Sequence, residues 1–211
     1  MTTIDSTTFR ARQVGAYLDA LGDGTPTPGG GSAAGLAGSL GCSLGRMVCS
    51  LTATHGASTE LTDLACTFER MGRDLLNLAE RDEKAFAHYR SAMSLPRATE
   101  SDKAARRASI ESALIGAAEV PLEMAEIGLE ALDTLRLTSS IGTKHALGDL
   151  MTGGFLVQAM VLGSIENIEA NASAMKTPEN RDRFTHAVAS VRRDLDARME
   201  ALAHAVALRS S

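Results

Sequence analysis

An aspartate stands on the apolar face of a predicted helix, at a position where an alanine or leucine would be expected. Asp82 lies at helical spacing from Leu78 and Phe86, so the three side chains share one face. An ionised carboxylate is costly on such a face unless it is paired, hydrated or functional. Asp82 is therefore a candidate general acid or base. The alternative is an aspartate at the water-exposed edge of the stripe.

Further polar side chains flank an apolar run in the second half of the chain. Asp149 precedes the run at 150–165, and Asn167 and Asn171 follow it. The two asparagines are four residues apart, so they point the same way from a helix. Carboxylates and amides suit acid–base work on a flat, neutral or cationic substrate without a metal. The asparagines are otherwise ordinary polar residues of a helix surface or a helix end.

Other catalytic signatures do not occur in the sequence. The five histidines form no HxxxH or HExxH pair and there is no CxxC, so we predict no metal site. There is no GxSxG motif, and the glycines at 29–31 lack the lysine of a P-loop. Cys49 as a nucleophile would need an adjacent base. We therefore expect chemistry without a metal or a separate cofactor.

A glycine-rich stretch over residues 26–52 is the element that must position these groups. Pro26 and Pro28 favour a rigid turn, and the glycines at 29–31 permit backbone geometries closed to other residues. Ser32 is a good N-cap, so we predict that a helix begins there.

Small residues continue along one face of that helix at intervals of three and four, which lets another backbone or a flat ligand come close. We expect the helix to be buried on nearly all sides. Two interpretations stay open: a central packing helix, or a helix whose amides at 29–32 face an anion or a ligand. The small-residue face consists of Ala34, Gly38, Gly41, Cys42 and Gly45.

The rest of the chain predicts helices and no strands. Pro121 is expected to kink or restart one of them, and Thr177 to cap the last. We predict an all-α fold with one domain over residues 1–211. It is a bundle of five to seven helices around the small-residue helix. Apolar periodicity places helices at 7–21, 32–54, 58–89, 99–135, 143–175 and 178–208.

Composition limits the partners and the compartment. The net charge is −5 and basic residues are scattered, which argues against a nucleic-acid partner. The N-terminus lacks the features of a signal peptide. The long run at 33–54 carries Arg46 among many Gly and Ser residues, so we expect a buried helix and no membrane span. Cys42 and Cys49 lie too far apart on one helix to bridge, which fits a reducing cytoplasm.

A series of short motifs follows the chain in order. The glycine stretch reads Pro-Thr-Pro-Gly-Gly-Gly-Ser-Ala-Ala, and its helix ends in Met-Val-Cys-Ser-Leu-Thr at 47–52. This stretch resembles the cyclodeaminase/cyclohydrolase family of folate enzymes. Later segments look like the family's Asp-x-x-Ala-Phe, Val-Pro-Leu, Ser-Asp-Leu and Asn-Val-x-x-Asn motifs: Asp82-Glu-Lys-Ala-Phe86, Glu119-Val-Pro-Leu122, Gly148-Asp149-Leu150 and Asn167-Ile-Glu-Ala-Asn171. The resemblance covers nearly everything from the first predicted helix to the last.

The resemblance implies an all-helical homodimer that binds a folate between helices. It implies hydrolysis of 5,10-methenyltetrahydrofolate to 10-formyltetrahydrofolate, with a tetrahydrofolate derivative as substrate and Asp82 as the catalytic acid and base. Water adds to the cationic carbon of the bridge, and the adduct then opens. The substrate-binding residues it implies are Pro28, Gly29, Gly30, Gly31, Ser32, Asp149, Asn167 and Asn171.

Three other functions stay open. One is a formiminotetrahydrofolate cyclodeaminase that releases ammonia, and another is a helical dimer that binds a ligand without catalysis. The third is a diverged relative that acts on a non-folate cyclic amidine or imine. The loop at 53–59 has no lysine or tyrosine where relatives commonly carry both, which favours the third. His55 in this loop is a candidate for proton transfer or substrate binding, and otherwise a solvated loop histidine.

Overall fold

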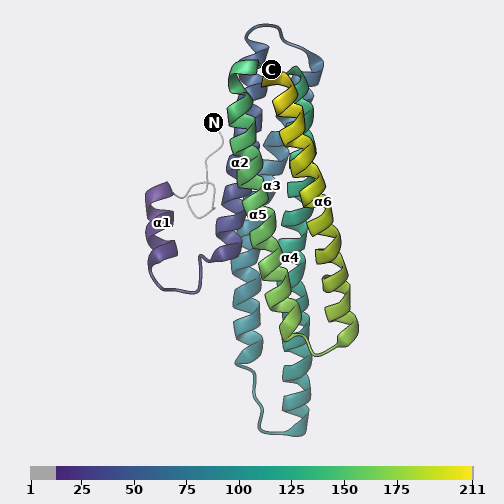
Figure 1. The fold of residues 1–211 in the computed structure, drawn as a ribbon. Coiled ribbons are helices and arrows are strands. Elements are labelled where there is room, and N and C mark those ends of the chain that lie inside the picture. The colour runs from purple at the N-terminus through teal and green to yellow at the C-terminus, as the bar shows by residue number, and fades with distance from the viewer. Residues whose placement is uncertain (1–12, 211) are drawn as a thin grey trace.

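The protein is a bundle of long helices with one short helix beside it (Figure 1). The computed structural model describes residues 13–210, and that part of the chain holds six α-helices and no strand. The predicted all-α fold is confirmed, while the expected helix start at residue 7 lies outside the described residues. In order, the elements are α1 (Val14–Gly22), α2 (Gly30–Ala53), α3 (Thr59–Met93), α4 (Glu100–Ile141), the 3-10 turn η2 (Lys144–Ala146), α5 (Leu147–Ala174) and α6 (Pro178–Ser210).

The two glycine-rich helices, α2 and α5, pack directly against each other. A Cβ atom added at Gly41 of α2 would lie 2.7 Å from the carbonyl oxygen of Gly153 in α5. A Cβ atom at Gly153 would lie 3.1 Å from the carbonyl oxygen of Gly41. Because Gly41 and Gly153 have no Cβ atom, the two helix backbones can approach each other closely.

One side of α2 is open, contrary to the expectation that it is buried nearly all round. Leu40, Met47 and Leu51 are exposed on this side. The opposite side faces α3 and the interior, where Cys42, Val48 and Cys49 are buried. The small-residue stripe thus fixes which face of α2 is inside, while larger apolar residues occupy the outer face.

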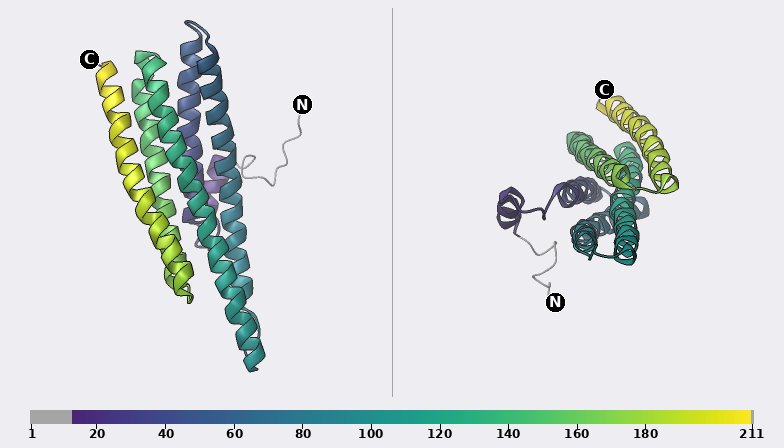
Figure 2. Two further views of the ribbon diagram at one scale, coloured as in Figure 1. Left: turned by 90° about the vertical axis from the view of Figure 1, so that its right-hand side faces the viewer. Right: turned by 90° about the horizontal axis from the view of Figure 1, so that it is seen from below.

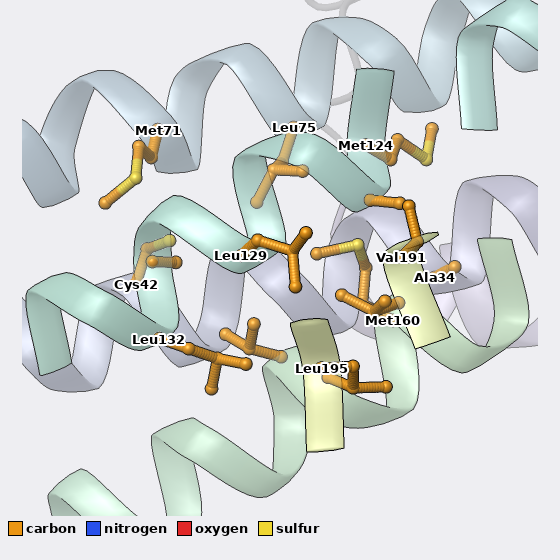
Figure 3. Close-up of a cluster of buried hydrophobic side chains, with 14 of the residues drawn as sticks. Ala34, Cys42, Met71, Leu75, Met124, Leu129, Leu132, Met160, Val191 and Leu195 are labelled. Atoms are coloured by element: carbon orange, nitrogen blue, oxygen red, sulfur yellow. The ribbon is translucent and has the colours of Figure 1, made fainter. Parts of the chain in front are cut away.

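The interior is filled by aliphatic and methionine side chains, as the low aromatic content requires. Met71 and Leu75 of α3 and Met160 of α5 belong to this buried cluster (Figure 3). Phe68 and Phe184 are the two fully buried aromatic side chains among the described residues. Figure 3 labels ten members of this core: Ala34, Cys42, Met71, Leu75, Met124, Leu129, Leu132, Met160, Val191 and Leu195.

α3 and α4 form a hairpin whose turn extends beyond the other helices (Figures 1 and 2). The Ser58 hydroxyl accepts a hydrogen bond from the amide of Leu61, at 3.2 Å, where α3 begins. Thr99 and Asp102 form a reciprocal capping box where α4 begins. These caps satisfy amides that a helix start leaves without partners, and both helices begin where the sequence predicts.

Pro121 does not end α4, which continues through it from Glu100 to Ile141. Of the predicted kink or restart, the restart is therefore wrong. Proline has no N–H group to donate to the carbonyl four residues earlier, which here belongs to Ala117. The Nδ2 group of Asn171, on α5, donates to that carbonyl at 3.0 Å. A side chain of the neighbouring helix thus supplies the hydrogen bond that the proline removes.

α1 stands beside the bundle and is linked to the turn before α2 (Figure 2). Tyr17 of α1 is buried, and its hydroxyl lies 3.2 Å from the hydroxyl of Ser32. The Ser32 hydroxyl donates to the carbonyl of Gly29 at 3.0 Å. α2 begins at Gly30 with Gly29 as its N-cap, so the predicted cap at Ser32 is wrong. Ser32 lies inside the first turn of α2, and its hydrogen bond to the Gly29 carbonyl helps to fix the glycine segment before the helix.

The segment Lys144–Ala174 is the one described segment that is long and apolar enough to cross a membrane. In its most apolar window, 44% is buried inside the bundle. Core helices of soluble proteins pass the same test, so this is weak evidence for a span. The segment differs from the run at 33–54 that the sequence brought to attention.

Candidate functional site

A cavity of about 300 Å³ lies at the N-terminal end of α2, where this end meets α3, α4 and α5. Asp82 of α3 lines it, together with the glycine turn and both predicted asparagines. The lining residues are Pro26, Thr27, Gly29, Gly30, Gly31, Asp82, Phe86, Tyr89, Ala117, Asn167, Ala170 and Asn171. Four segments that are distant in the sequence therefore converge on one carboxylate.

A larger groove of about 650 Å³ runs between α3 and α4 farther along the hairpin. Its described lining consists mainly of small residues such as Ala92 and Ser109, with His88 as its titratable group. It holds no carboxylate or amide side chain. The smaller cavity at Asp82 is therefore the candidate site, because its groups can move protons and bind a polar ligand.

The carboxyl of Asp82 packs directly on the backbone of Gly31. A Cβ atom added at Gly31 would overlap the carboxyl group. Gly30 differs, because a Cβ atom there would meet only the Asn167 amide, at 3.9 Å. Among the three glycines of the turn, Gly31 is thus the one whose missing side chain makes room for Asp82.

The surroundings of Asp82 favour its protonated form. Burial raises the pKa of Asp82 from 3.8 to about 6, and the negative charge of Glu83 adds to this effect. Neither a hydrogen bond nor a cation of a described residue offsets these two causes. A carboxyl with a pKa near neutrality can accept a proton and then return it, which is what a general base and acid requires.

The two asparagines reach the cavity from successive turns of α5. Asn167 donates through Nδ2 to the carbonyl of Gly163, at 2.8 Å. Asn171 donates through Nδ2 to the carbonyl of Asn167, at 2.9 Å, as well as to that of Ala117. Both Nδ2 donors of Asn171 are thus engaged by the backbone, whereas Asn167 uses one of its two. The Oδ1 atoms of both side chains can accept hydrogen bonds from a ligand, and Asn167 can also donate one.

Two aromatic side chains of the site were not among the predicted site residues. Phe86 and Tyr89 follow Asp82 by four and seven residues, so they lie on the same face of α3 and extend the cavity along it. The sequence already places Phe86 on the face of Asp82, and the same helical spacing reaches Tyr89. Phe86 is exposed at the cavity, whereas Tyr89 is half-buried and also packs against the core.

The structure does not bring all predicted site residues to this cavity. Pro28 and Ser32 are buried behind the turn and are not among the lining residues. His55 follows the C-terminal end of α2, so the length of the helix, about 36 Å by its rise, separates it from the cavity. Asp149 lies in the first turn of α5, whereas Asn167 and Asn171 are near its end. Within one copy, His55 and Asp149 therefore lie at the other end of the bundle.

Two further kinds of chemistry find no support in the described residues. No cluster of three or more His, Cys, Asp or Glu side chains that could hold a metal occurs among them. Cys49 is buried with its sulfur 4.0 Å from the Thr138 hydroxyl, and burial raises its pKa. A thiol with a raised pKa is a poor nucleophile.

Comparison with known proteins gives consistent results. The sequence model of the family described as "Formiminotransferase-cyclodeaminase" matches residues 13–190. The methenyltetrahydrofolate cyclohydrolase of Methylorubrum extorquens is 32% identical over 163 residues, which are 75% of this chain and 78% of that protein. The formimidoyltransferase-cyclodeaminase of Gallus gallus is 28% identical over 164 residues, 76% of this chain but 30% of that protein. The chain thus spans about a third of the animal relatives it matches.

The fold also has a solved counterpart. The crystal structure of formiminotetrahydrofolate cyclodeaminase from Thermotoga maritima superposes with a TM-score of 0.83. The match covers 93% of this chain and 96% of that one, at 19% sequence identity. At this identity the likeness establishes the helical fold, and the chemistry has to be argued from the site itself.

Proposed function

Because the chain belongs to the formiminotransferase-cyclodeaminase family, we propose that it is a folate one-carbon enzyme that hydrolyses 5,10-methenyltetrahydrofolate to 10-formyltetrahydrofolate. The observation that carries the proposal is the partly buried Asp82 carboxyl at the glycine turn, with its pKa raised to about 6. The 32% identity with a methenyltetrahydrofolate cyclohydrolase over most of its length supports this reaction over the others of the family.

Asp82 serves this reaction by moving one proton twice. As a carboxylate it takes a proton from water while the water oxygen bonds to the cationic bridge carbon. When the tetrahedral adduct opens, the bond from that carbon to N5 breaks and Asp82 returns the proton to N5. The hydroxyl proton of the adduct leaves to solvent, so the net change is uptake of water and release of one proton. A carboxyl with a pKa near the working pH is suited to both steps.

The charge of the cavity also suits a cationic reaction centre. Asp82 and the neighbouring Glu83 supply negative potential, which favours binding of the amidinium bridge. The asparagine Oδ1 atoms are placed to accept hydrogen bonds from the amino and amide edge of the pterin ring. Phe86 and Tyr89 offer flat apolar surfaces beside it.

Absorbance spectroscopy tests the proposal directly. Wild-type protein should accelerate the loss of methenyltetrahydrofolate absorbance, and Asp82→Asn should lose this activity while still binding the substrate. Decay at the uncatalysed rate with wild-type protein, whose fold is verified by circular dichroism, would contradict the proposal. If wild type and Asp82→Asn were equally active, the proposed reaction would stand, but Asp82 would not be its acid and base.

Two alternatives have specific support. The Gallus gallus and Thermotoga maritima proteins carry cyclodeaminase names, so release of ammonia from formiminotetrahydrofolate is the second candidate reaction. The loop at 53–59, without lysine or tyrosine, favours a diverged relative that acts on a non-folate cyclic amidine or imine. Parallel assays for ammonia release and for folate binding separate these two from the cyclohydrolase and from a dimer that only binds a ligand.

The proposal includes finer points about the working enzyme. The substrate is a tetrahydrofolate derivative and no separate cofactor takes part. The protein acts as a homodimer in the cytoplasm, with neither nucleic acid nor a membrane as partner. The buried thiols of Cys42 and Cys49 suit a reducing compartment. The exposed apolar side of α2 and α5 suits a second copy of the chain.

A further inference from the structure

Tyr17 attaches α1 to the bundle. It is the one buried residue of this helix, at 4% exposure, whereas Val14 and Leu18 are 70% and 57% exposed. Its ring packs with Ala79 of α3, and half-buried leucines of α1, α2 and α3 surround the pair. Figure 2 shows α1 standing beside the bundle, next to α2. Because few other side chains of α1 are buried, Tyr17 is the residue that joins this helix to its neighbours.

The Tyr17 hydroxyl is the donor in its hydrogen bond with Ser32. A serine hydroxyl carries one hydrogen atom, and that of Ser32 goes to the Gly29 carbonyl at 3.0 Å. The Ser32 oxygen therefore accepts from Tyr17, at 3.2 Å. Ser32 is fully buried, so water cannot replace this donor. Two linked hydrogen bonds thus run from α1 through Ser32 to the Gly29 carbonyl, which also accepts from the amide of Ala33.

The turn that these hydrogen bonds hold is the one that contacts Asp82. Gly31 directly precedes the buried serine, and a Cβ atom added there would overlap the Asp82 carboxyl. Ala79, which packs with the Tyr17 ring, precedes Asp82 by three residues and lies on the same side of α3. Tyr17 therefore joins the two helices that meet at this contact. It reaches α2 through its hydroxyl and α3 through its ring.

The backbone of Gly31 covers one side of the Asp82 carboxyl. Burial is the main cause of the raised pKa of Asp82, and the charge of Glu83 on the same helix is the second. Apart from Asp82, no described residue that lines the cavity is charged, and Tyr89 is the one other titratable residue of the lining. If the glycine turn moved away from α3, water would reach the carboxyl and its pKa would fall toward the ordinary value.

We propose that Tyr17 is a positioning residue, which holds the glycine turn of α2 against α3 and so fixes the place of the Asp82 carboxyl in the cavity. Its part in turnover rests on the proposed function, in which Asp82 takes a proton from water and returns it. Tyr17 is not among the residues that line the cavity, so it acts on the reaction through Asp82. A helix that contributes no lining residue thereby takes part in the chemical step.

An NMR titration of the aspartate carboxyls in the full chain tests the position of Asp82 without an activity assay. The Asp82 signal is the one that Asp82→Asn removes. Wild type should titrate at a pH of about 6. Tyr17→Phe should titrate about half a pH unit lower, and Tyr17→Ala about one unit lower or more, because it also loses the contact with α3. Tyr17→Phe keeps the ring, so it decides the question even where Tyr17→Ala does not fold.

The matched control is Ser43→Ala. Its hydroxyl donates within α2, to the carbonyl of Ser39, so this variant should titrate as wild type does. A wild-type Asp82 that titrates near 3.8 overturns the proposal, since burial against the turn would then have no effect. The same result follows if the Asp82 pKa is unchanged in the Tyr17 variants while circular dichroism shows that they are folded.

A double-mutant cycle tests the route through Ser32. Tyr17→Phe removes the donor and Ser32→Ala removes the oxygen that accepts from it, so both variants break the same pair of hydrogen bonds. The double variant should therefore lower the Asp82 pKa by no more than the larger of the two single changes. Additive changes overturn the route, because the two hydroxyls would then act on Asp82 separately.

Kinetics test the consequence for catalysis. Tyr17→Phe should lower kcat for methenyltetrahydrofolate about three- to tenfold and leave KM within about twofold, because no contact with the substrate is lost. The acid limb of kcat/KM should move to lower pH together with the Asp82 pKa. A raised KM with an unchanged kcat overturns the proposal, since the variant would then have altered binding alone. If wild-type protein does not convert methenyltetrahydrofolate, the proposed function fails, while the NMR titration still decides whether Tyr17 positions Asp82.

Discussion

The Nδ2 group of Asn171 donates to the carbonyl oxygen of Ala117 at 3.0 Å, and this carbonyl is the one that Pro121 leaves without its helical donor. The bond joins α5 to α4 at the wall of the cavity, where both residues are part of the lining. The hydrogen bond from Asn171 thus replaces the one that the proline in α4 cannot make. It keeps α4 continuous, and it holds the Asn171 side chain toward the site.

Removing Asn171 should cost stability only while Pro121 is present. Asn171→Ala leaves the Ala117 carbonyl without a donor in the interior, at a cost of about 1–3 kcal/mol in the free energy of unfolding. Pro121→Ala restores a backbone N–H for the same carbonyl. Urea denaturation of the two single variants and the double variant should show that Asn171→Ala costs clearly less in the Pro121→Ala background. Equal costs in both backgrounds would show that the bond to Ala117 is not what Asn171 contributes.

Adding one methyl group at Gly31 should displace the catalytic carboxyl. The Cβ atom of Gly31→Ala would overlap Asp82, so the side chain must leave its position against the turn. We expect kcat to fall by about ten- to a hundredfold, as a misplaced acid–base group implies. The matched control is Gly116→Ala on α4, where nothing lies within 4 Å of an added Cβ atom. That variant should keep full activity and gain up to about 1 kcal/mol of stability. A fully active Gly31→Ala enzyme would contradict the assignment.

The rate should follow the titration of Asp82. Its pKa is raised to about 6, and the carboxylate is the form that takes the proton from water. We therefore expect kcat/KM to be constant above pH 7 and to fall about tenfold per pH unit below 6. Glu83→Gln removes the charge that helps to raise the pKa, so the acid limb should move to lower pH. A limb that stays in place in this variant would show that another group controls the rate.

Much of the fold could be predicted because local rules and packing agree along this chain. α3 and α4 begin at Thr59 and Glu100, each within one residue of the predicted starts at 58 and 99. The small-residue face of α2 also lets another backbone come close, as the sequence predicts, and that backbone is α5. The restart expected at Pro121 does not occur, and a partner far away in the sequence, Asn171, donates to the carbonyl that the proline leaves without a donor. No local rule contains such a partner. The cap predicted at Ser32 is wrong for a local reason, because α2 begins two residues earlier and the Ser32 hydroxyl donates to the carbonyl of Gly29.

The site was partly predictable for a related reason. Asp82 was detectable because a carboxylate interrupts an apolar stripe, and the structure brings it together with the glycine turn and both asparagines. Asp149 was predicted from a sequence motif and His55 from its place in the loop at 53–59. Neither observation tells which end of the bundle the residue occupies. Their distance from the cavity depends on helix length and direction, and these follow only from the assembled fold.

Asp82→Asn should stabilise the protein above pH 6 while it removes activity. The folded protein holds the Asp82 proton up to about pH 6, whereas the unfolded chain releases it near 3.8. Between these values the unfolded chain binds fewer protons, so stability falls as pH rises, and the loss is complete above pH 6. Discounted for the partial solvent exposure of Asp82, the pKa shift corresponds to a loss of about 1–2 kcal/mol in the free energy of unfolding. Thermal unfolding from pH 4 to 8 should show this decline in wild type and not in Asp82→Asn. The control Asp63→Asn, at an exposed position on α3, should follow wild type. A variant that is less stable than wild type at pH 7 would show that the Asp82 charge is stabilised where it lies, and the argument for a raised pKa would fall with it.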